Sequence, residues 1–297
     1  MVLLVHGFPE SWYSWRHQLT ALAAAGYRTV AIDVRGYGRS SAPVEVEAYG
    51  MLQHVSDNLG VLEALGEDKA TIVGHDWGSI IAAHCALLRP DVFTGLAMLS
   101  SPYAPPGTIR PTDAMRAAGG DEEFYIMYFQ APGRAEAEAE MDVRHWMLGI
   151  LMAVSGDAVA TPDGGAVTTV PAGQMLRDRF VIPDRLPGWL TETDLDFYVE
   201  EFERTGFRGG LNRYRNMDLD WEDLQPWRGQ PITVPSLFIG GQRDPSTRGG
   251  QRAIAKFGES LPGLRGNHLL AGCGHWVQQE RPEEVNRLLI DWLNALP

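Results

Sequence analysis

The sequence predicts an α/β fold, in which a mostly parallel β-sheet is flanked by helices and interrupted by a largely helical insertion. Short apolar runs alternate with helical patterns through the first hundred residues, an order typical of a parallel sheet with helices on both faces. The same pattern returns near the C-terminus, whereas clear strands are missing in between. We therefore expect a sheet domain formed by residues 1–103 and 225–297, with a helical cap over residues 104–224.

The first part of the sheet domain is expected to contain four strands and three helices. The strands are predicted from apolar runs at residues 1–5, 29–32, 70–73 and 95–99. The helices are predicted from apolar residues spaced three and four apart at residues 12–25, 52–65 and 80–88. In the first helix Leu19, Leu22 and Ala23 should share the buried face, and Gly26 should end the helix.

The insertion is expected to consist of helices and loops, after which the sheet pattern returns. Residues 161–165 are predicted to be a loop, and the alternating Ala and Glu residues at 135–140 a solvent-exposed helix face. Two further strands are predicted at residues 235–239 and 267–270. A last amphipathic helix, starting near Pro282, should bury Val285, Leu288, Leu289 and Trp292.

Length and composition exclude several classes of protein. The 297 residues are 44% hydrophobic and 21% charged, which is ordinary for a folded globular chain. The formal net charge of −13 disfavours nucleic acid or an anionic membrane as a partner. No apolar run reaches the roughly 18 residues that span a membrane, and no secretory signal is visible. Two cysteines, Cys85 and Cys273, are too few for a disulfide framework, so we expect a reducing, cytoplasmic location.

The strongest single motif is Gly74-His75-Asp76-Trp77-Gly78, which lies between a predicted strand and a predicted helix. A sharp strand-to-helix turn that exposes its central side chain needs small residues two positions to either side. In the commonest form of this turn the central residue is Ser, and here it is Asp76. Taken alone, the motif is equally compatible with an ordinary turn, so its meaning depends on partners elsewhere in the chain.

Two residues supply such partners in the order expected of a catalytic triad, because the acid and the base follow the nucleophile along the chain in folds of this type. Asp244 follows the predicted strand at 235–239, and His275 follows the strand at 267–270. Both therefore lie at strand ends, where open α/β sheets bind their ligands. Each alone is also compatible with a structural role, as a turn residue or a buried histidine. Residues 100–106, after the preceding strand, contain no carboxylate, which makes Asp244 the preferred acid to orient His275.

A third element is His6-Gly7-Phe8-Pro9, which follows the first predicted strand. An oxyanion is commonly stabilised by the backbone N–H that follows the nucleophile and by a second one from this loop. Trp77 and Phe8 occupy the two matching positions. By itself the segment is also compatible with an ordinary restrained loop.

An aspartate nucleophile points to displacement at a saturated carbon. A serine would leave an ether there, whereas Asp76 would leave an alkyl ester that water activated by His275 can hydrolyse. The leaving group is then a halide, which needs only N–H donors, or an epoxide oxygen, which needs a proton donor such as tyrosine. Tyrosines occur in the insertion within residues 124–130 and 211–216, although aromatic residues in a helical cap more often serve packing.

These motifs resemble those of the α/β-hydrolase-fold epoxide hydrolases over nearly the whole chain. In the sheet domain the resemblance is carried by the segments at residues 6–9, 74–78 and 272–276, the last reading Gly-Cys-Gly-His-Trp. In the cap it is carried by residues 125–138, which begin Tyr-Ile-Met-Tyr-Phe, and by residues 206–216, which end Asn-Arg-Tyr-Arg-Asn. The two cap motifs are the more specific, because haloalkane and fluoroacetate dehalogenases share the sheet-domain motifs in part.

The resemblance implies an α/β-hydrolase fold with an inserted cap, and an enzyme that hydrolyses small-molecule epoxides to vicinal diols. It implies no metal and no organic cofactor, and the sequence shows no compact metal-ligand spacing. Under it Asp76 is the nucleophile, His275 the base and Asp244 the orienting acid. Phe8 and Trp77 match the oxyanion-hole residues.

The resemblance also implies two tyrosines that assist ring opening, with the substrate lying between the sheet domain and the cap. Tyr125 and Tyr214 match them, Tyr125 less securely because Tyr128 is one helical turn away. Further residues are expected to contact the substrate, although each is equally compatible with core packing: Phe8, Pro9, Trp12, Trp77, Met127, Phe129 and Trp276.

One departure and three alternatives stay open at this point. The family fold usually begins with two further strands, whereas this sequence begins within the strand that leads to residues 6–9; no predicted site residue is affected. The nearest alternative is a haloalkane dehalogenase, in which Trp77 would serve the halide. A second alternative is a protein that binds a ligand but does not convert it, and the intact triad disfavours this interpretation. A third is an esterase, which the absence of Ser at position 76 disfavours. The natural substrate, the stereochemistry and the choice between monomer and homodimer are not fixed by the sequence.

Overall fold

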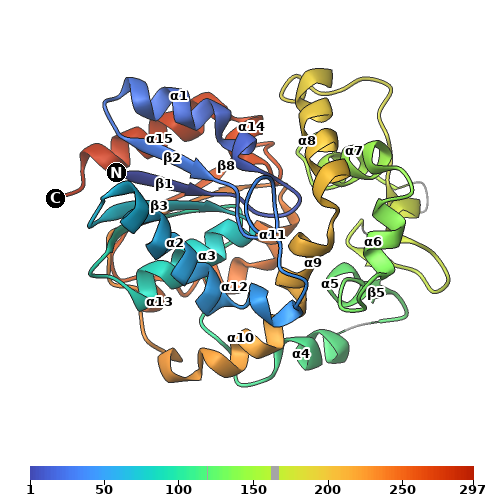
Figure 1. The fold of residues 1–297 in the computed structure, drawn as a ribbon, viewed down its shortest axis with the longest axis horizontal. Coiled ribbons are helices and arrows are strands. Elements are labelled where there is room, and N and C mark those ends of the chain that lie inside the picture. Colours follow the sequence, from blue (N-terminus) through green and yellow to red (C-terminus); the bar gives the residue numbers. More distant parts are fainter. Residues whose placement is uncertain (119, 162–166) are drawn as a thin grey trace. The chain divides into compact units, whose positions relative to one another are not determined.

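We use a computed structural model of the protein and describe residues 1–118, 120–161 and 167–297 of it. The predicted loop at 161–165 lies, apart from its first residue, outside the described residues. The chain divides into two compact units (Figure 1). Unit 1 comprises Met1–Val34, Met51–Pro105 and Gly229–Pro297, and unit 2 comprises Arg35–Gly50 and Pro106–Arg228.

Unit 1 is built on a six-stranded sheet whose strand order is β2-β1-β3-β4-β7-β8. All five neighbouring pairs run parallel, which confirms the predicted parallel sheet. The strands are β1 (Val2–Val5), β2 (Thr29–Ile32), β3 (Ala70–His75), β4 (Phe93–Leu99), β7 (Ser236–Gly241) and β8 (Leu264–Leu270). Because the strands are parallel, the segments that follow β1, β3, β7 and β8 all leave the sheet at the same edge.

Helices cover both faces of this sheet (Figure 1). On one face α1 (Arg16–Ala24), α14 (Val277–Glu280) and α15 (Pro282–Asn294) contact one another, and on the other α2 (Met51–Leu65) packs against α3 (Trp77–Leu88). Shorter helices complete unit 1: η1 (Trp12–Trp15), α11 (Pro245–Gly249), α12 (Gln251–Ile254) and α13 (Phe257–Ser260).

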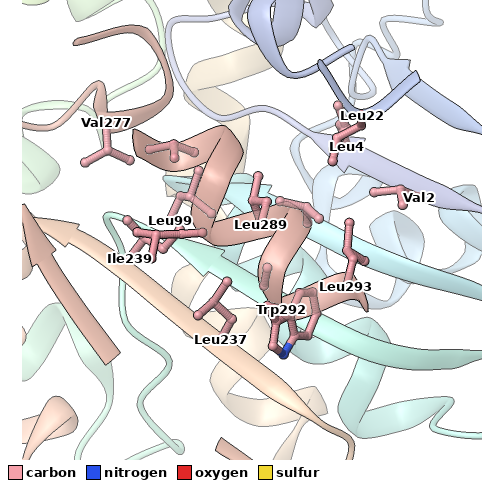
Figure 2. Close-up of a cluster of buried hydrophobic side chains, with 14 of the residues drawn as sticks. Val2, Leu4, Leu22, Leu99, Leu237, Ile239, Val277, Leu289, Trp292 and Leu293 are labelled. Atoms are coloured by element: carbon pink, nitrogen blue, oxygen red, sulfur yellow. The ribbon is translucent and has the colours of Figure 1, made fainter. Parts of the chain in front are cut away.

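The C-terminal helix α15 packs across the sheet and forms much of its core. The predicted buried residues Val285, Leu288, Leu289 and Trp292 are all buried, so this prediction is confirmed. Figure 2 shows Leu289 and Trp292 beside residues of β1, β4 and β7. Each such side chain contributes about 1.5–3 kcal/mol through its burial, which makes α15 a main source of stability for unit 1.

The prediction that Leu22 and Ala23 lie on the buried face of α1 is confirmed for Leu22 and wrong for Ala23, which is exposed. Because α1 contacts α14 and α15, its buried face runs through Gln18 and Leu22, which are four residues apart. The Nε2 of Gln18 donates a hydrogen bond of 3.0 Å to the carbonyl of Gln278. Gly26 follows the end of the helix with a φ of +90°, as the sequence predicts.

Unit 2 is mostly helical but contains one short antiparallel sheet that the sequence analysis did not predict. Strand β5 (Glu123–Phe124) pairs with β6 (Thr169–Val170), and two residues per strand are too few to produce an alternating pattern. The helices are η2 (Val46–Tyr49), α4 (Pro111–Ala118), α5 (Tyr125–Tyr128), α6 (Arg134–Ala139), α7 (Val143–Ala153), η3 (Leu176–Arg179), α8 (Glu192–Thr205), α9 (Arg208–Arg215), α10 (Met217–Asp223) and η4 (Gln225–Trp227).

Residues 35–50, which the sequence analysis placed in the sheet domain, cluster with unit 2. The reason is that polar side chains from α8, α9 and the end of α9 hold this segment by its backbone carbonyls. The hydrogen bonds join Arg204 to Gly38, Arg213 to Tyr49, and Asn216 to Val46. These donors lie more than 160 residues further along the chain. A local sequence pattern therefore could not predict the contact.

The acidic run at 135–140 is not the exposed face that the sequence predicts. In α6 the carboxylates of Glu136 and Glu138 are both buried, at 8% and 2% exposure. Glu138 accepts hydrogen bonds from the Nε1 of Trp146 and from two backbone N–H groups of η3. Glu136 accepts two bonds from Arg215. A buried carboxylate needs such partners, and they come from segments distant in sequence.

Candidate active site

Asp76 lies at the sharp turn between β3 and α3. Its φ of +52° and ψ of −122° are rare for a residue other than glycine. The turn brings backbone segments very close together. A Cβ atom at Gly74 would lie 2.0 Å from the carbonyl oxygen of Gly78, and one at Gly78 would lie 2.0 Å from the carbonyl oxygen of Val5. Both glycines are therefore needed for the turn that presents Asp76.

Replacing Gly74 by Ala is expected to destabilise unit 1 by about 1–3 kcal/mol, because the added methyl meets backbone that cannot move aside. Urea unfolding followed by circular dichroism measures the change. Gly60→Ala is the matched control, since an added Cβ in the middle of α2 meets no atom within 4 Å. That variant should gain about 0.5–1 kcal/mol from helix propensity. Equal effects of the two substitutions would contradict this account of the turn.

The predicted triad residues come together within unit 1. The Nδ1 of His275 lies 2.9 Å from Oδ1 of Asp244, and its Nε2 lies 3.4 Å from Oδ2 of Asp76. His275 follows β8, and Asp244 follows β7 as the N-cap of α11. Asp244 is fully buried, and it also accepts hydrogen bonds from the N–H of Ser246 and the hydroxyl of Thr247. These bonds fix the carboxylate that faces the imidazole.

The charges of the three groups shift one another's pKa values. Burial alone would raise the pKa of Asp76, but the hydrogen bond and charge of His275 hold it below its ordinary value. Burial would likewise raise the pKa of Asp244, and the charge of His275 again keeps it low. Burial would lower the pKa of His275, but the Asp244 and Asp76 carboxylates raise it well above its ordinary value. The unreacted site therefore favours an imidazolium between two carboxylates.

The segment that follows β1 contacts Asp76 through its backbone. The N–H of Phe8 donates a hydrogen bond of 2.9 Å to Oδ1 of Asp76. A Cβ atom at Gly7 would lie 2.3 Å from the same Oδ1, so only glycine permits this approach. Trp77 is the first residue of α3, and the first N–H groups of a helix lie at the positive end of its dipole. The Phe8 N–H thus lies against the Asp76 carboxylate, and the N-terminus of α3 begins directly after Asp76.

Three buried polar residues support this site, and the sequence analysis missed them. Glu10 accepts hydrogen bonds from the N–H of Gly7 at 3.0 Å and lies 2.6 Å from Nδ1 of His75. The Nε2 of His75 lies 2.8 Å from the carbonyl oxygen of His275. These contacts join the segment after β1, the turn at Asp76 and the segment after β8. Glu10 directly follows the motif at 6–9 and His75 lies within the motif at 74–78, and this proximity was the only sequence feature that could have pointed to them.

The third of these residues is Glu280, in α14. Its two carboxylate oxygens accept the backbone N–H groups of Gly274, at 2.8 Å, and Trp276, at 3.1 Å. The two donors flank His275 directly, so Glu280 holds the backbone on both sides of the imidazole.

The two tyrosines singled out from the sequence lie in unit 2, on α5 and α9. The ring centroids of Tyr125 and Tyr214 are 6.2 Å apart, and the ring of Phe129 contacts both, at 5.5 and 5.1 Å. The hydroxyl of the rival residue Tyr128 is instead bonded to the buried carboxylate of Glu138, at 2.5 Å. Tyr128 itself is only 2% exposed.

The remaining predicted contact residues differ in exposure. Phe129 and Trp276 are each 1% exposed, and Trp276 packs edge-on against His275 with centroids 4.7 Å apart. Phe8 and Pro9 are buried, and Trp77 and Met127 are half-buried. Trp12 is 37% exposed.

Neither a metal cluster nor a membrane helix is found in the part of the chain that the structure describes. Among residues 1–118, 120–161 and 167–297, no three His, Cys, Asp or Glu side chains are grouped so that they could hold a metal ion. Within the same ranges, no helix combines the length and apolar character needed to cross a membrane.

Comparison with known proteins gives consistent results. Residues 1–147 match the model of a family described as alpha/beta hydrolase fold. Epoxide hydrolase B of Mycobacterium tuberculosis is 45% identical over 326 aligned residues, which cover 100% of this chain and 92% of that protein.

Two solved structures are also close to this chain. An epoxide hydrolase from an endophytic Streptomyces has a TM-score of 0.97 and 62% identity, covering 99% of this chain and 88% of that one. Epoxide hydrolase A from Mycobacterium thermoresistibile has a TM-score of 0.93 and 46% identity, covering 100% of this chain and 91% of that one. This chain therefore spans most of the length of each of these relatives.

Proposed function

Because the chain belongs to the epoxide hydrolases of the α/β-hydrolase fold, we propose that it hydrolyses a small-molecule epoxide to a vicinal diol through an ester on Asp76. The named relatives confirm the family resemblance that the sequence motifs indicate. The chain is therefore a hydrolase of the epoxide hydrolase type. The observation that carries the covalent proposal is the carboxylate at the turn, with Nε2 of His275 3.4 Å from one of its oxygens.

The first step is attack by Asp76 on a ring carbon of the epoxide. Its lowered pKa keeps the carboxylate ionised and nucleophilic at neutral pH. Because Oδ1 accepts the Phe8 N–H, we assign the attack to Oδ2, the oxygen that faces His275. The bond from Oδ2 to the ring carbon forms while the bond from that carbon to the ring oxygen breaks.

The ring oxygen leaves as a developing alkoxide and needs a proton donor. We assign this role to Tyr125 and Tyr214, since a phenol with a reference pKa of about 10 is protonated at neutral pH. The close edge-on arrangement of the two rings supports their action on one atom. The commitment of the Tyr128 hydroxyl to Glu138 supports Tyr125 over Tyr128.

The second step is hydrolysis of the ester by water. Alkylation removes the charge of Asp76, and that charge is one of the causes that raise the pKa of His275. Loss of this charge lowers the pKa of His275, so the imidazolium gives its proton to solvent and a neutral imidazole becomes available as the base. It takes a proton from a water molecule that attacks Cγ of Asp76, with Asp244 stabilising the resulting cation. The oxyanion forms on Oδ1, where the N–H groups of Phe8 and Trp77 stabilise it. Its collapse breaks the bond from Cγ to Oδ2, and Oδ2 takes the proton from His275 and departs as part of the diol. The second proton of the water is released as the Asp76 carboxylate forms again, and it replaces the proton that a tyrosine gave to the ring oxygen.

The proposed chemistry uses only the epoxide and water, with no metal or organic cofactor. We propose that the reactant is contacted by Phe8, Pro9, Trp77, Met127, Phe129 and Trp276. The dehalogenase alternative shares Asp76 and His275 but has no use for two phenols. The named relatives, which are epoxide hydrolases, also do not favour it.

Replacing Tyr125 and Tyr214 together by Phe is expected to suppress epoxide opening by about 10²–10⁴-fold, the usual contribution of a general acid. The substitution keeps both rings and removes only the hydroxyl groups. Diol formation from styrene oxide, followed by chromatography, measures the loss.

The same assay with a chloroalkane tests the rival function. The wild-type protein should release diol from styrene oxide and no chloride from the chloroalkane. Tyr128→Phe serves as the matched tyrosine variant, and it should retain most of the diol-forming rate. Chloride release without diol formation would establish the dehalogenase instead. A near-normal diol rate in the double variant would show that other groups protonate the ring oxygen.

A further inference from the structure

We propose that Arg215 is a positioning residue for epoxide opening, because its guanidinium fixes Tyr214 on α9 relative to Tyr125 on α5. This inference rests on the proposed function, since it assumes that the two phenols act together on one oxygen. Arg215 directly follows Tyr214 in the chain, but its side chain binds the end of α5, the helix that carries Tyr125. Every residue involved lies in unit 2.

The donors of Arg215 are directed to the segment that follows α5, to α6 and to α9 itself. Its Nε donates to the carbonyl of Phe129 at 3.0 Å, and Nη2 donates to the carbonyl of Ala131 at 3.3 Å. Nη1 donates to Oδ1 of Asn212 at 2.9 Å. The two terminal nitrogens also form a two-point ion pair with Glu136, at 2.7 and 2.9 Å. The side chains of Arg215 and Glu136 are 4% and 10% exposed.

These contacts set the distance between the two elements that carry the tyrosines. Phe129 is the C-cap of α5, so a bond to its carbonyl holds the end of the helix on which Tyr125 lies. The ring of Phe129 fills the space beside both phenols. Gln130 adds a second link, because its Nε2 donates to the carbonyls of Ile126 and Tyr214 at 3.1 and 3.0 Å.

A positional role explains why this link is ionic. A buried ion pair is often no more stabilising than apolar side chains of similar volume. The planar guanidinium, however, fixes direction as well as distance through two parallel bonds, which a lysine cannot do. Because displacement of a catalytic group by about 1 Å can cost on the order of 100-fold in rate, the geometry of this link matters more than its strength.

The two steps of the reaction separate a positional role from a structural one. Alkylation needs the phenols, whereas ester hydrolysis needs His275, Asp244 and the backbone donors of unit 1. We therefore expect Arg215→Lys to slow alkylation by about 10- to 100-fold and to leave the rate constant of hydrolysis unchanged. Rapid mixing with excess styrene oxide, acid quenching and mass measurement of the alkylated protein give both rate constants.

The matched control is Arg144→Lys on the same unit. Arg144 also pairs with two carboxylates, Glu192 and Asp196, but these groups are exposed. This variant should leave both rate constants unchanged. If Arg215→Lys folds poorly, the double variant Arg215→Met/Glu136→Met removes the ion pair without leaving an unpaired buried charge, and it should slow alkylation by a similar factor.

The possible outcomes are distinct. Slower alkylation with unchanged hydrolysis supports the inference. Unchanged alkylation in a folded Arg215 variant overturns it, and so does a smaller amount of alkylated protein formed at the wild-type rate, which indicates a structural role alone. If the wild-type protein never forms an alkylated species, the proposed function itself fails and the inference falls with it.

Discussion

Asp76→Ala is expected to abolish diol formation, lowering turnover by about 10⁴-fold or more, as loss of a nucleophile does in other covalent enzymes. Without the carboxylate no alkyl ester can form, and His275 has no ester on which to direct water. The rest of the site has no second carboxylate at this position, since Asp244 is fully buried behind the imidazole. Diol formation from styrene oxide measures the loss, and circular dichroism establishes that the variant is folded.

Two further variants separate chemistry from backbone strain. Because Asp76 has a positive φ, alanine at this position is strained, whereas Asp76→Gly adopts the same backbone without a Cβ penalty. Asp76→Ala and Asp76→Gly should be equally inactive. Asp91→Ala, which removes an exposed carboxylate paired with Arg89, should keep full activity. Appreciable turnover by a folded Asp76 variant would contradict covalent catalysis.

Labelled water tests the same step in the unaltered enzyme. With enzyme in excess over epoxide, a single turnover in water enriched in heavy oxygen should place the label in the Asp76 carboxylate. The first diol should be unlabelled, because its new oxygen is Oδ2 of Asp76. Label that enters the first diol directly would show that water attacks the epoxide itself.

The parts of this site that could be predicted from sequence are those with a local steric or topological cause. The turn at Asp76 needs glycines at fixed positions on both sides, so Gly74 and Gly78 mark it. Asp244 and His275 were found because each follows a short apolar strand, and parallel strands bring their ends to one edge of the sheet. The pattern of apolar residues alone was sufficient to predict that all six strands of unit 1 exist.

The parts that could not be predicted depend on contacts between residues far apart in the chain. Glu10 and His75 are 65 positions apart, and no spacing rule relates them. The acidic run in α6 alternates like an exposed surface, yet Glu136 is buried because Arg215, 79 positions away, neutralises it. Burial of a charged side chain depends on its partner, and a local sequence pattern contains no information about that partner.

His275→Gln is expected to trap the alkyl ester on Asp76. Glutamine cannot accept a proton from water at neutral pH, so alkylation proceeds and hydrolysis stops. Mass spectrometry should show an increase equal to one epoxide molecule, located on the peptide that contains Asp76. His145→Gln, a substitution of a half-buried histidine on α7 of unit 2, should leave no such adduct. Absence of an adduct under saturating epoxide would contradict the role of His275 as the base.

The pH dependence of trapping provides a second check, and its sign follows from the electrostatics of the site. In the wild-type protein burial would raise the pKa of Asp76, and His275 holds it below its ordinary value. Without the imidazole the effect of burial remains, so the pKa of Asp76 rises in the variant. A larger fraction of the carboxylate is then protonated as the pH falls, and a protonated carboxyl is a poor nucleophile. Alkylation of His275→Gln should therefore slow towards acid pH, at values where the wild-type protein still alkylates. Once formed, the ester should persist across the same range, because the base that would remove it is missing at every pH.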